Sequence, residues 1–181
     1  MADRTHAPGR LDVLRAFANT LDLETGEDAL ASADQAREWC FARDLPPPGA
    51  DDVDRVRGFR EALRSVLLAN NGDGEQASAW QAVVPYAREA RLILTVSAGS
   101  RRPELEAADR GADGTIGALL AIGYSAVADG TWARLKACAK DSCQFAFYDR
   151  SKNASGTWCD MAVCGNRAKA QRRRLRDRQN S

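Results

Sequence analysis

The chain has 181 residues, of which 44% are hydrophobic and 28% are charged, and its formal net charge is +1. This length is enough for one substantial core, and it predicts one domain, or one domain with a small module. No stretch approaches the roughly 18 to 20 apolar residues that span a bilayer, and residues 1–20 lack the apolar segment of a signal peptide. We therefore expect a cytoplasmic protein with no membrane partner.

Charge is divided unevenly along the chain. Residues 133–181 contain 12 Lys or Arg and 4 Asp, a balance of +8, which leaves 14 basic and 21 acidic side chains, a balance of −7, in residues 1–132. An acidic body with a basic end favours a polyanionic partner for that end, most often a nucleic acid. A solvated tail without a partner would show the same pattern, so charge alone leaves both interpretations open.

Two amphipathic helices are predicted near the start of the chain. Apolar residues recur at helical spacing through residues 10–23, beginning with Leu11. A second helix is predicted over residues 27–43. It ends before the prolines that begin at Pro46, because proline cannot continue a helix.

The middle of the chain predicts two further helices and a hairpin. The clearest helix follows Asp51 and Asp52 and ends at residues 70–72, and another covers residues 75–89. The period then changes to two in residues 91–107, with Gly99 at the expected turn of a β-hairpin. A helix over residues 115–128 leads to an Asp-Gly turn.

Four of the five cysteines form two closely spaced pairs, C-x4-C-x15-C-x4-C. Two short-spaced cysteine pairs are typical of a tetrahedral zinc site, because each pair wraps one edge of the ion. The predicted ligands of one structural Zn²⁺ are Cys138, Cys143, Cys159 and Cys164. The fifth, Cys40, lies beside Trp39 on a predicted helix, and we expect a buried core thiol.

Other uses of the four cysteines are less favoured. Two disulfides are an alternative, but cytosolic thiols stay reduced and the chain shows no export signal. Redox catalysis is usually marked by C-x-x-C beside a βαβ pattern, and neither is present. A catalytic zinc would need an open coordination position and usually a histidine or carboxylate ligand, whereas four cysteines close the site.

The sequence around the cysteines predicts the secondary structure that positions them. Alternating residues from Leu135 to Ala137 and from Phe145 to Phe147 predict two strands joined by the first cysteine turn. Gly165 follows the second pair, where a basic helix is expected to begin. A hairpin with two ligands and a helix start with two more is similar to a treble-clef finger. We expect the module's aromatic residues, with Leu135 and Met161, to form its own miniature core.

The residues from 134 to 174 resemble a known family, the CGNR zinc finger, whose name corresponds here to Cys164, Gly165, Asn166 and Arg167. The resemblance includes both cysteine pairs, the segment FYDRSKN and the Trp before the third cysteine. Residues 17–22, FANTLD, resemble the opening motif of the ABATE domain of stress-induced transcription regulators. The resemblance implies a DNA-binding regulator. The sequence departs from the family at residues 154–157, where family members usually carry one or more arginines.

The predicted fold class is therefore α+β. A predominantly helical N-terminal domain with one β-hairpin is expected over residues 10–131. It is followed over residues 132–178 by a small treble-clef-like zinc-binding module that ends in a basic helix.

The basic end is the predicted nucleic-acid interface. Arginine's planar fork suits phosphates and guanine edges, and arginine outnumbers lysine here. Arg167 could instead pair with Asp149 or Asp160 and brace the module. The predicted contacts to DNA are Arg167, Lys169, Arg172, Arg173, Arg174, Arg176 and Arg178.

Other functions stay open. The basic end could bind an acidic protein partner or RNA, which would make the chain a zinc-stabilised interaction module. A homo-oligomer is compatible with either function. We do not expect an enzyme, because no nucleophile, phosphate loop or paired-carboxylate motif stands out. The helical domain could sense a small-molecule effector. Asn19 and Thr20 are its candidate ligand contacts, although capping and hydrogen-bonding a loop is the favoured role for this pair.

Overall fold

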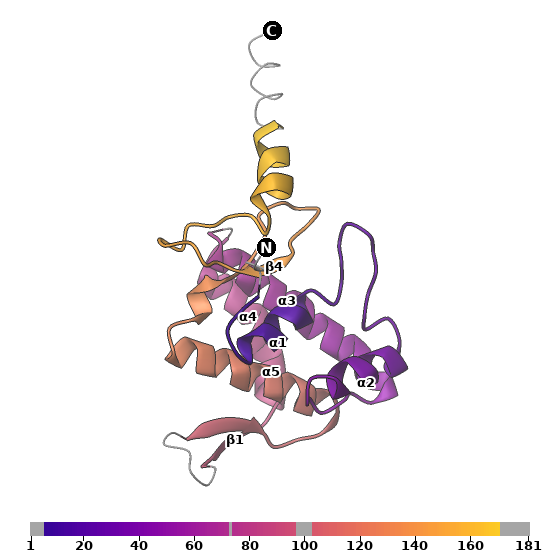
Figure 1. Cartoon of the computed structure of the whole chain (residues 1–181). Coiled ribbons are helices and arrows are strands. Elements are labelled where there is room, and N and C mark those ends of the chain that lie inside the picture. The colour runs from indigo at the N-terminus through magenta and orange to yellow at the C-terminus, as the bar shows by residue number, and fades with distance from the viewer. Residues whose placement is uncertain (1–5, 73, 97–102, 171–181) are drawn as a thin grey trace.

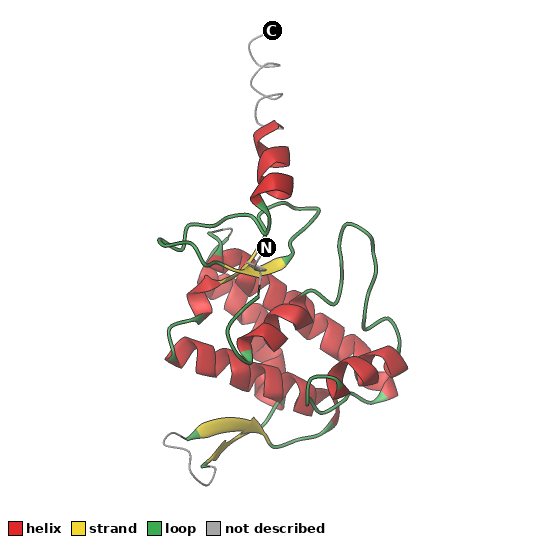
Figure 2. Cartoon of the chain, viewed as in Figure 1, coloured by secondary structure: helices red, strands yellow, loops and turns green. Residues whose placement is uncertain are grey.

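A computed structural model describes residues 6–72, 74–96 and 103–170 of the chain. These residues are mainly helical, with two small antiparallel hairpins (Figure 2), which confirms the predicted fold class. The helices are α1 (Leu11–Ala18), α2 (Ala33–Phe41), α3 (Val53–Asn70), α4 (Gln76–Glu89) and α5 (Gly111–Ala128), and short helical turns are η1 (Ala50–Asp52), η2 (Trp132–Arg134) and η3 (Met161–Gly165). The strands are β1 (Leu92–Thr95), β2 (Glu104–Ala107), β3 (Leu135–Ala137) and β4 (Ala146–Tyr148).

The first helix is shorter than its apolar pattern predicts. α1 ends at Ala18, and a β-bridge then pairs Leu21 with Asp28. The Thr20 hydroxyl donates to the Phe17 carbonyl at 2.8 Å. Such side-chain bonds to the backbone compete with helix continuation, so the chain turns away while its apolar spacing still looks helical.

The second helix begins later than predicted. α2 starts at Ala33, whereas the sequence pattern places its start at position 27. The Ser32 side chain accepts a hydrogen bond from the Gln35 N–H and caps the helix. The residues before Ser32 instead form the turn that follows the bridge to Asp28.

The core is organised around α3, which packs against α1, α4 and α5 (Figure 1). Phe17 and Phe59 are completely buried at its centre, with ring centroids 5.8 Å apart. Leu67 lies on α3, like Phe59, and is also fully buried. α4 lies where the sequence predicts it and continues through Pro85.

The last long helix is more apolar than the sequence analysis recognised. α5 begins at Gly111, earlier than predicted, and its 18 residues have a mean hydropathy of 1.2. By length and composition alone it could cross a membrane. Ile116 and Leu119 are fully buried in the core, however, and α5 packs against α1, α3 and α4. The core therefore accounts for the buried face of this helix.

The β1–β2 hairpin is confirmed, with Leu92 opposite Ala107 in an antiparallel register. The predicted turn at Gly99 lies outside the described residues. The hairpin lies against α5 (Figure 1). A Cβ on Gly117 of α5 would come within 3.1 Å of the Ala107 Cβ, so this glycine lets helix and strand approach closely.

The second hairpin shares the core of the helical body. Leu135, Ala137, Ala146 and Tyr148 of β3 and β4 are buried in the same apolar cluster as the helices. Leu135 and Tyr148 of the predicted miniature core therefore belong to the core of the body, and Met161, which was also expected in it, is 51% exposed. Phe147 is buried outside the body's apolar cluster, as a separate core would have it. Two three-residue strands offer too little apolar surface for a core of their own, so they use that of α1 and α3.

Candidate metal centre

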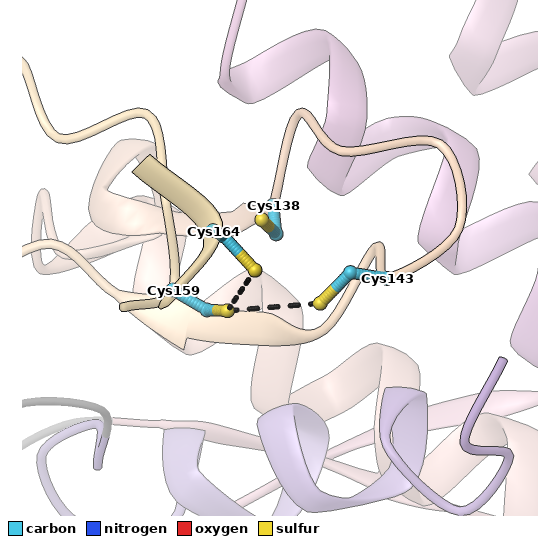
Figure 3. A group of neighbouring side chains, drawn as sticks. All are labelled: Cys138, Cys143, Cys159 and Cys164. Carbon is cyan, nitrogen blue, oxygen red and sulfur yellow. Dashed lines mark hydrogen bonds between the residues drawn. The ribbon is translucent and has the colours of Figure 1, made fainter. Parts of the chain in front are cut away.

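Four cysteine side chains gather where the β3–β4 hairpin meets the start of the C-terminal helix (Figure 3). The Cys159 Sγ lies 3.7 Å from the Sγ atoms of Cys143 and Cys164, and with Cys138 all four sulfur atoms lie within 4.8 Å of one another. A tetrahedral ion with zinc–sulfur bonds of about 2.3 Å separates its sulfur ligands by about 3.8 Å. The cluster therefore has the size of a four-cysteine zinc site.

The β3–β4 hairpin positions the first pair. The Cys138 N–H donates to the Phe145 carbonyl at 3.0 Å and extends the ladder beyond the strands. In the turn, the N–H groups of Cys143 and Gln144 donate to the Lys140 carbonyl at 2.8 and 3.0 Å. Gln144 has a φ of 46°, in the left-handed region, and closes the turn. This turn brings Cys143 back beside Cys138.

A capped helical turn positions the second pair. The Asp160 carboxylate accepts hydrogen bonds from the N–H groups of Ala162 and Val163 at 2.6 and 3.0 Å, which caps η3. The Cys164 N–H donates to the Asp160 carbonyl at 2.9 Å. Residues 166–170 then continue as α-helix. One ligand thus precedes the helix and the other lies in its first turn.

Gly165 lies close to the side chains of Met161 and Trp158 and does not have a left-handed backbone. A Cβ at this position would lie 2.4 Å from the Met161 sulfur and 3.2 Å from Cδ1 of Trp158. Its φ is not positive. Met161 is flexible and 51% exposed, so its sulfur could move aside, and the requirement for a residue without a Cβ after the second pair stays a prediction.

Thiols this close cannot all ionise without a cation. Hydrogen bonds with Cys143 and Cys159 lower the pKa of Cys138. Hydrogen bonds with Cys138 and Cys143 raise the pKa of Cys159, and burial together with the negative charge on Cys138 raises that of Cys164. A bound dication offsets this repulsion and lets all four act as thiolates. The donor set fits one structural Zn²⁺, since four thiolates leave no open position for catalysis.

Two asparagines of the helical body hold the backbone of the metal module. The Asn71 amide donates to the carbonyls of Ala137 and Thr157 at 2.7 and 2.8 Å, which joins the strand before Cys138 to the segment before Cys159. The Asn19 amide donates to the Ala146 carbonyl at 2.9 Å and accepts from its N–H at 2.7 Å. α3 ends at Asn70 as predicted, but no sequence signal indicated the clamp that Asn71 forms.

A buried arginine adds a third link. Arg64 of α3 donates to the Gln144 carbonyl in the cysteine turn at 3.1 Å and to the Ala18 carbonyl at the end of α1 at 2.7 Å. Its Nε donates to Glu61 at 3.0 Å, which balances its charge. The cysteine turn is therefore tied to two helices of the body.

A buried ion pair organises the loop between the two cysteine pairs. The Lys136 ammonium lies 2.9 Å from the Asp149 carboxylate and also donates to the carbonyls of Ala154 and Gly156 at 2.6 and 3.1 Å. Burial alone would raise the pKa of Asp149, but hydrogen bonds from Ser151 and Lys136 outweigh it and lower that pKa to about 2. A Cβ on Gly156 would meet the Asp149 carboxylate at 2.8 Å, which explains a glycine in this loop.

Asp149→Asn should destabilise the zinc-loaded chain by about 3 kcal/mol, because it leaves a buried ammonium without its counter-ion. Urea unfolding at neutral pH measures this. Asp149 is ionised in the folded chain down to a pKa of about 2, against an ordinary 3.8, so its stabilisation is present above that ordinary value and is lost as the pH falls toward 2. The difference in the free energy of unfolding between wild type and variant should therefore become smaller as the pH falls over that range.

Asp141→Asn is the matched control, because Asp141 carries the same charge in the same module but is exposed. It should change the free energy of unfolding by less than about 0.5 kcal/mol. Equal effects of the two substitutions would show that the buried pair with Lys136 does not stabilise the loop.

The first basic residues after the cysteines meet an acidic side chain of the body. Arg167 Nη1 lies 3.2 Å from the Glu24 carboxylate, which also pairs with Lys140 of the cysteine turn. Arg167 therefore does not pair with Asp149 or Asp160, the partners that the sequence suggested. Its side chain remains 60% exposed, and Lys169 is also exposed. The other predicted contacts, from Arg172 to Arg178, lie outside the described residues.

The two candidate effector contacts use their polar groups within the chain. The Asn19 amide makes both of its hydrogen bonds with the backbone of Ala146. Thr20 is buried, and its hydroxyl accepts a hydrogen bond from Arg60 at 3.1 Å while it donates to Phe17. Cys40 is also buried, and burial raises the pKa of its thiol to about 11, as befits a core residue.

Comparison with known protein families agrees with this arrangement. The CGNR zinc finger model matches residues 134–177, which include all four clustered cysteines. The ABATE model, described as "Putative stress-induced transcription regulator", matches residues 11–138. Neither family is described as an enzyme. A search of curated proteins gave no match. The chain therefore belongs to the ABATE family and carries a CGNR zinc finger after its helical body.

Proposed function

We propose that this protein is a cytoplasmic DNA-binding transcription regulator. Cys138, Cys143, Cys159 and Cys164 hold one Zn²⁺, and the metal fixes the start of a basic helix that binds duplex DNA. Residues 132–178 form the DNA-binding domain of this proposal, and residues 10–131 form a domain that senses a small molecule.

The observation that carries the proposal is the direction of the C-terminal helix. It starts at the cysteine cluster and projects away from the helical body (Figure 1). Arg167 and Lys169 are exposed on it, and five further arginines follow in the sequence. A helix this basic gains little from burial, whereas phosphates relieve its self-repulsion. Zinc at its first turn supplies the anchor that an apolar face would otherwise provide.

Fluorescence anisotropy with a labelled 20-bp duplex tests the proposal. The zinc-loaded chain should bind, and heparin should displace it, since both polyanions compete for the same arginines. The main alternative is a zinc-stabilised module that binds an acidic protein or RNA. Absence of duplex binding at low salt would favour that alternative, and it would agree with the ion pair that already joins Arg167 to an acidic side chain.

Glu24→Gln should tighten duplex binding by about two- to five-fold at low salt, the effect expected from freeing Arg167, a predicted DNA contact, from its exposed ion pair. Glu24 pairs with both Arg167 and Lys140, so it competes with phosphates for these two cations. The gain should disappear at high salt, because screening weakens the pair and the phosphate contacts alike. The measurement is the same anisotropy titration at two salt concentrations.

Glu27→Gln is the control for this prediction. It removes the same charge from the same loop and is exposed, and its side chain contacts neither cation among the ion pairs of the described residues. An equal gain from both variants would mean that Glu24 acts only through the net charge of the body.

A further inference from the structure

A cavity of about 270 Å³ lies among α3, α4, α5 and the β1–β2 hairpin. None of the described residues that line it carries a charge; they are aliphatic or aromatic side chains, with one alanine and one glycine. Leu63 and Leu119 form part of its inner wall, and Trp80, Tyr124 and Trp132 contribute aromatic rings. It is therefore an apolar space with few groups that could satisfy a polar ligand.

Gly123 of α5 lines this cavity, so a side chain at this position would occupy part of it. A glycine inside a helix costs about 0.5 to 1 kcal/mol relative to alanine, so it usually has a local reason. Gly123 does not have a positive φ, and an added Cβ would make only ordinary contacts, 3.6 Å from Trp132 and 3.8 Å from Leu14. Gly114, on the same helix, differs, because its Cβ would lie 2.4 Å from a backbone oxygen. Neither backbone conformation nor close packing requires a glycine at position 123.

The cavity meets solvent along aromatic and aliphatic side chains. Of the residues that line it, Trp80 is 37%, Tyr124 61% and Val127 54% exposed. Apolar side chains exposed together beside a hollow are a feature of ligand-binding sites. The hollow is concave and of limited volume, which suits a small molecule better than a flat protein surface.

We propose that this cavity binds a neutral, largely apolar molecule of about two fused rings. An apolar cavity of roughly 150 Å³ can hold a benzene-sized ligand, and this one is larger. A charged or strongly polar ligand would lose its hydration without gaining partners from the wall. The site lies apart from Asn19 and Thr20, whose polar groups are already occupied.

The cavity wall continues directly into the zinc module. Trp132 lines the cavity and packs against Trp80, with ring centroids 5.5 Å apart and ring planes tilted by 33°. It opens η2, which leads without interruption into β3 and Cys138. The Asn70 amide donates to the Leu135 carbonyl at 2.9 Å and holds this segment on α3. An occupant that contacts Trp132 thus touches the segment that carries the first cysteine, and this inference deepens the sensing half of the proposed function, on which it rests.

Calorimetric titration of the zinc-loaded full chain with 2-naphthol tests the site, with adenine as a polar molecule of similar size. We expect saturable binding of one 2-naphthol per chain and none of adenine. Gly123→Leu, which fills the cavity, should weaken binding at least tenfold, and Gly123→Ala should weaken it less. Ala87→Trp at the exposed side of the cavity is a second blocking variant, which keeps the test valid if Gly123→Leu does not fold.

Three results would overturn the inference. These are absence of 2-naphthol binding, unchanged binding in both blocking variants, or sedimentation showing a wild-type dimer that the blocking variants dissociate, since a second copy would then be the occupant. Duplex binding is measured in parallel without 2-naphthol. If the wild-type chain binds 2-naphthol but no duplex, the result counts against the DNA-binding proposal only. If it binds the duplex but no 2-naphthol, the result counts against the ligand site in the cavity only.

Discussion

Cys164→Ser should destabilise the whole chain and not only its zinc finger. Structural zinc contributes about 10 to 16 kcal/mol of apparent binding free energy in small fingers at neutral pH, and domains of this size are stable by only about 5 to 15 kcal/mol. Leu135 and Ala146, next to the cysteine turn, are buried in the core of the helical body. Loss of the metal should therefore loosen the packing of α1 and α3 as well. We expect zinc content to fall from about one per chain to near zero, and thermal unfolding by circular dichroism to begin at a much lower temperature.

Cys40→Ala is the control for this prediction. Cys40 is buried in α2 and lies outside the sulfur cluster, so its replacement should retain one zinc per chain. It should lower stability only by the cost of a small cavity, about 1 kcal/mol. Retention of zinc and of the wild-type unfolding temperature by Cys164→Ser would rule out Cys164 as a ligand.

Replacing Arg172, Arg173 and Arg174 together with glutamine should weaken duplex binding strongly at low salt. Each phosphate contact contributes about −0.9 to the slope of log affinity against log salt. If the basic segment contacts six or so phosphates, the wild-type slope is about −5, and the triple variant should reduce it to between about −2 and −3. Anisotropy titrations at four or more salt concentrations measure both slopes.

The matched control removes the same charge from the body. Arg37, Arg88 and Arg110 are exposed and lie on the helical part of the chain. Their combined replacement with glutamine should leave the slope near that of the wild type. Equal losses in the two triple variants would mean that net charge, rather than the basic segment, attracts DNA.

The sequence was sufficient to predict those elements whose pattern lies within the element itself. The helix over residues 53–70 has regular apolar spacing and clear ends, and it is confirmed as α3. The cysteine spacing predicted the cluster of all four sulfur atoms, because each closely spaced pair forms a local metal-binding turn. The late start of α2 was not predicted. The bridge between Leu21 and Asp28 holds the preceding residues outside the helix, and the apolar spacing used to predict helices does not show such a bridge.

Long-range contacts account for what the sequence could not show. Asn19 and Asn71 bind backbone groups that lie 127 and 66 positions away, and no local pattern marks either asparagine as a clamp. The same holds for Glu24, which reaches Arg167 across 143 positions. The separate core predicted for the finger fails at Leu135 for a related reason. The residues around Leu135 alternate as they would in an isolated hairpin, but β3 packs on α3 and β4 packs on α1.

Duplex affinity with and without zinc tests the central claim most directly, because the claim is that the metal positions the basic helix. The zinc-loaded chain is bound to a labelled duplex, zinc is withdrawn with a chelator, and zinc is then restored in the same sample. We predict that the complex dissociates on chelation and re-forms when zinc returns. Unchanged affinity after verified removal of the metal would contradict the account, since the arginines would then bind DNA without the anchor at Cys164.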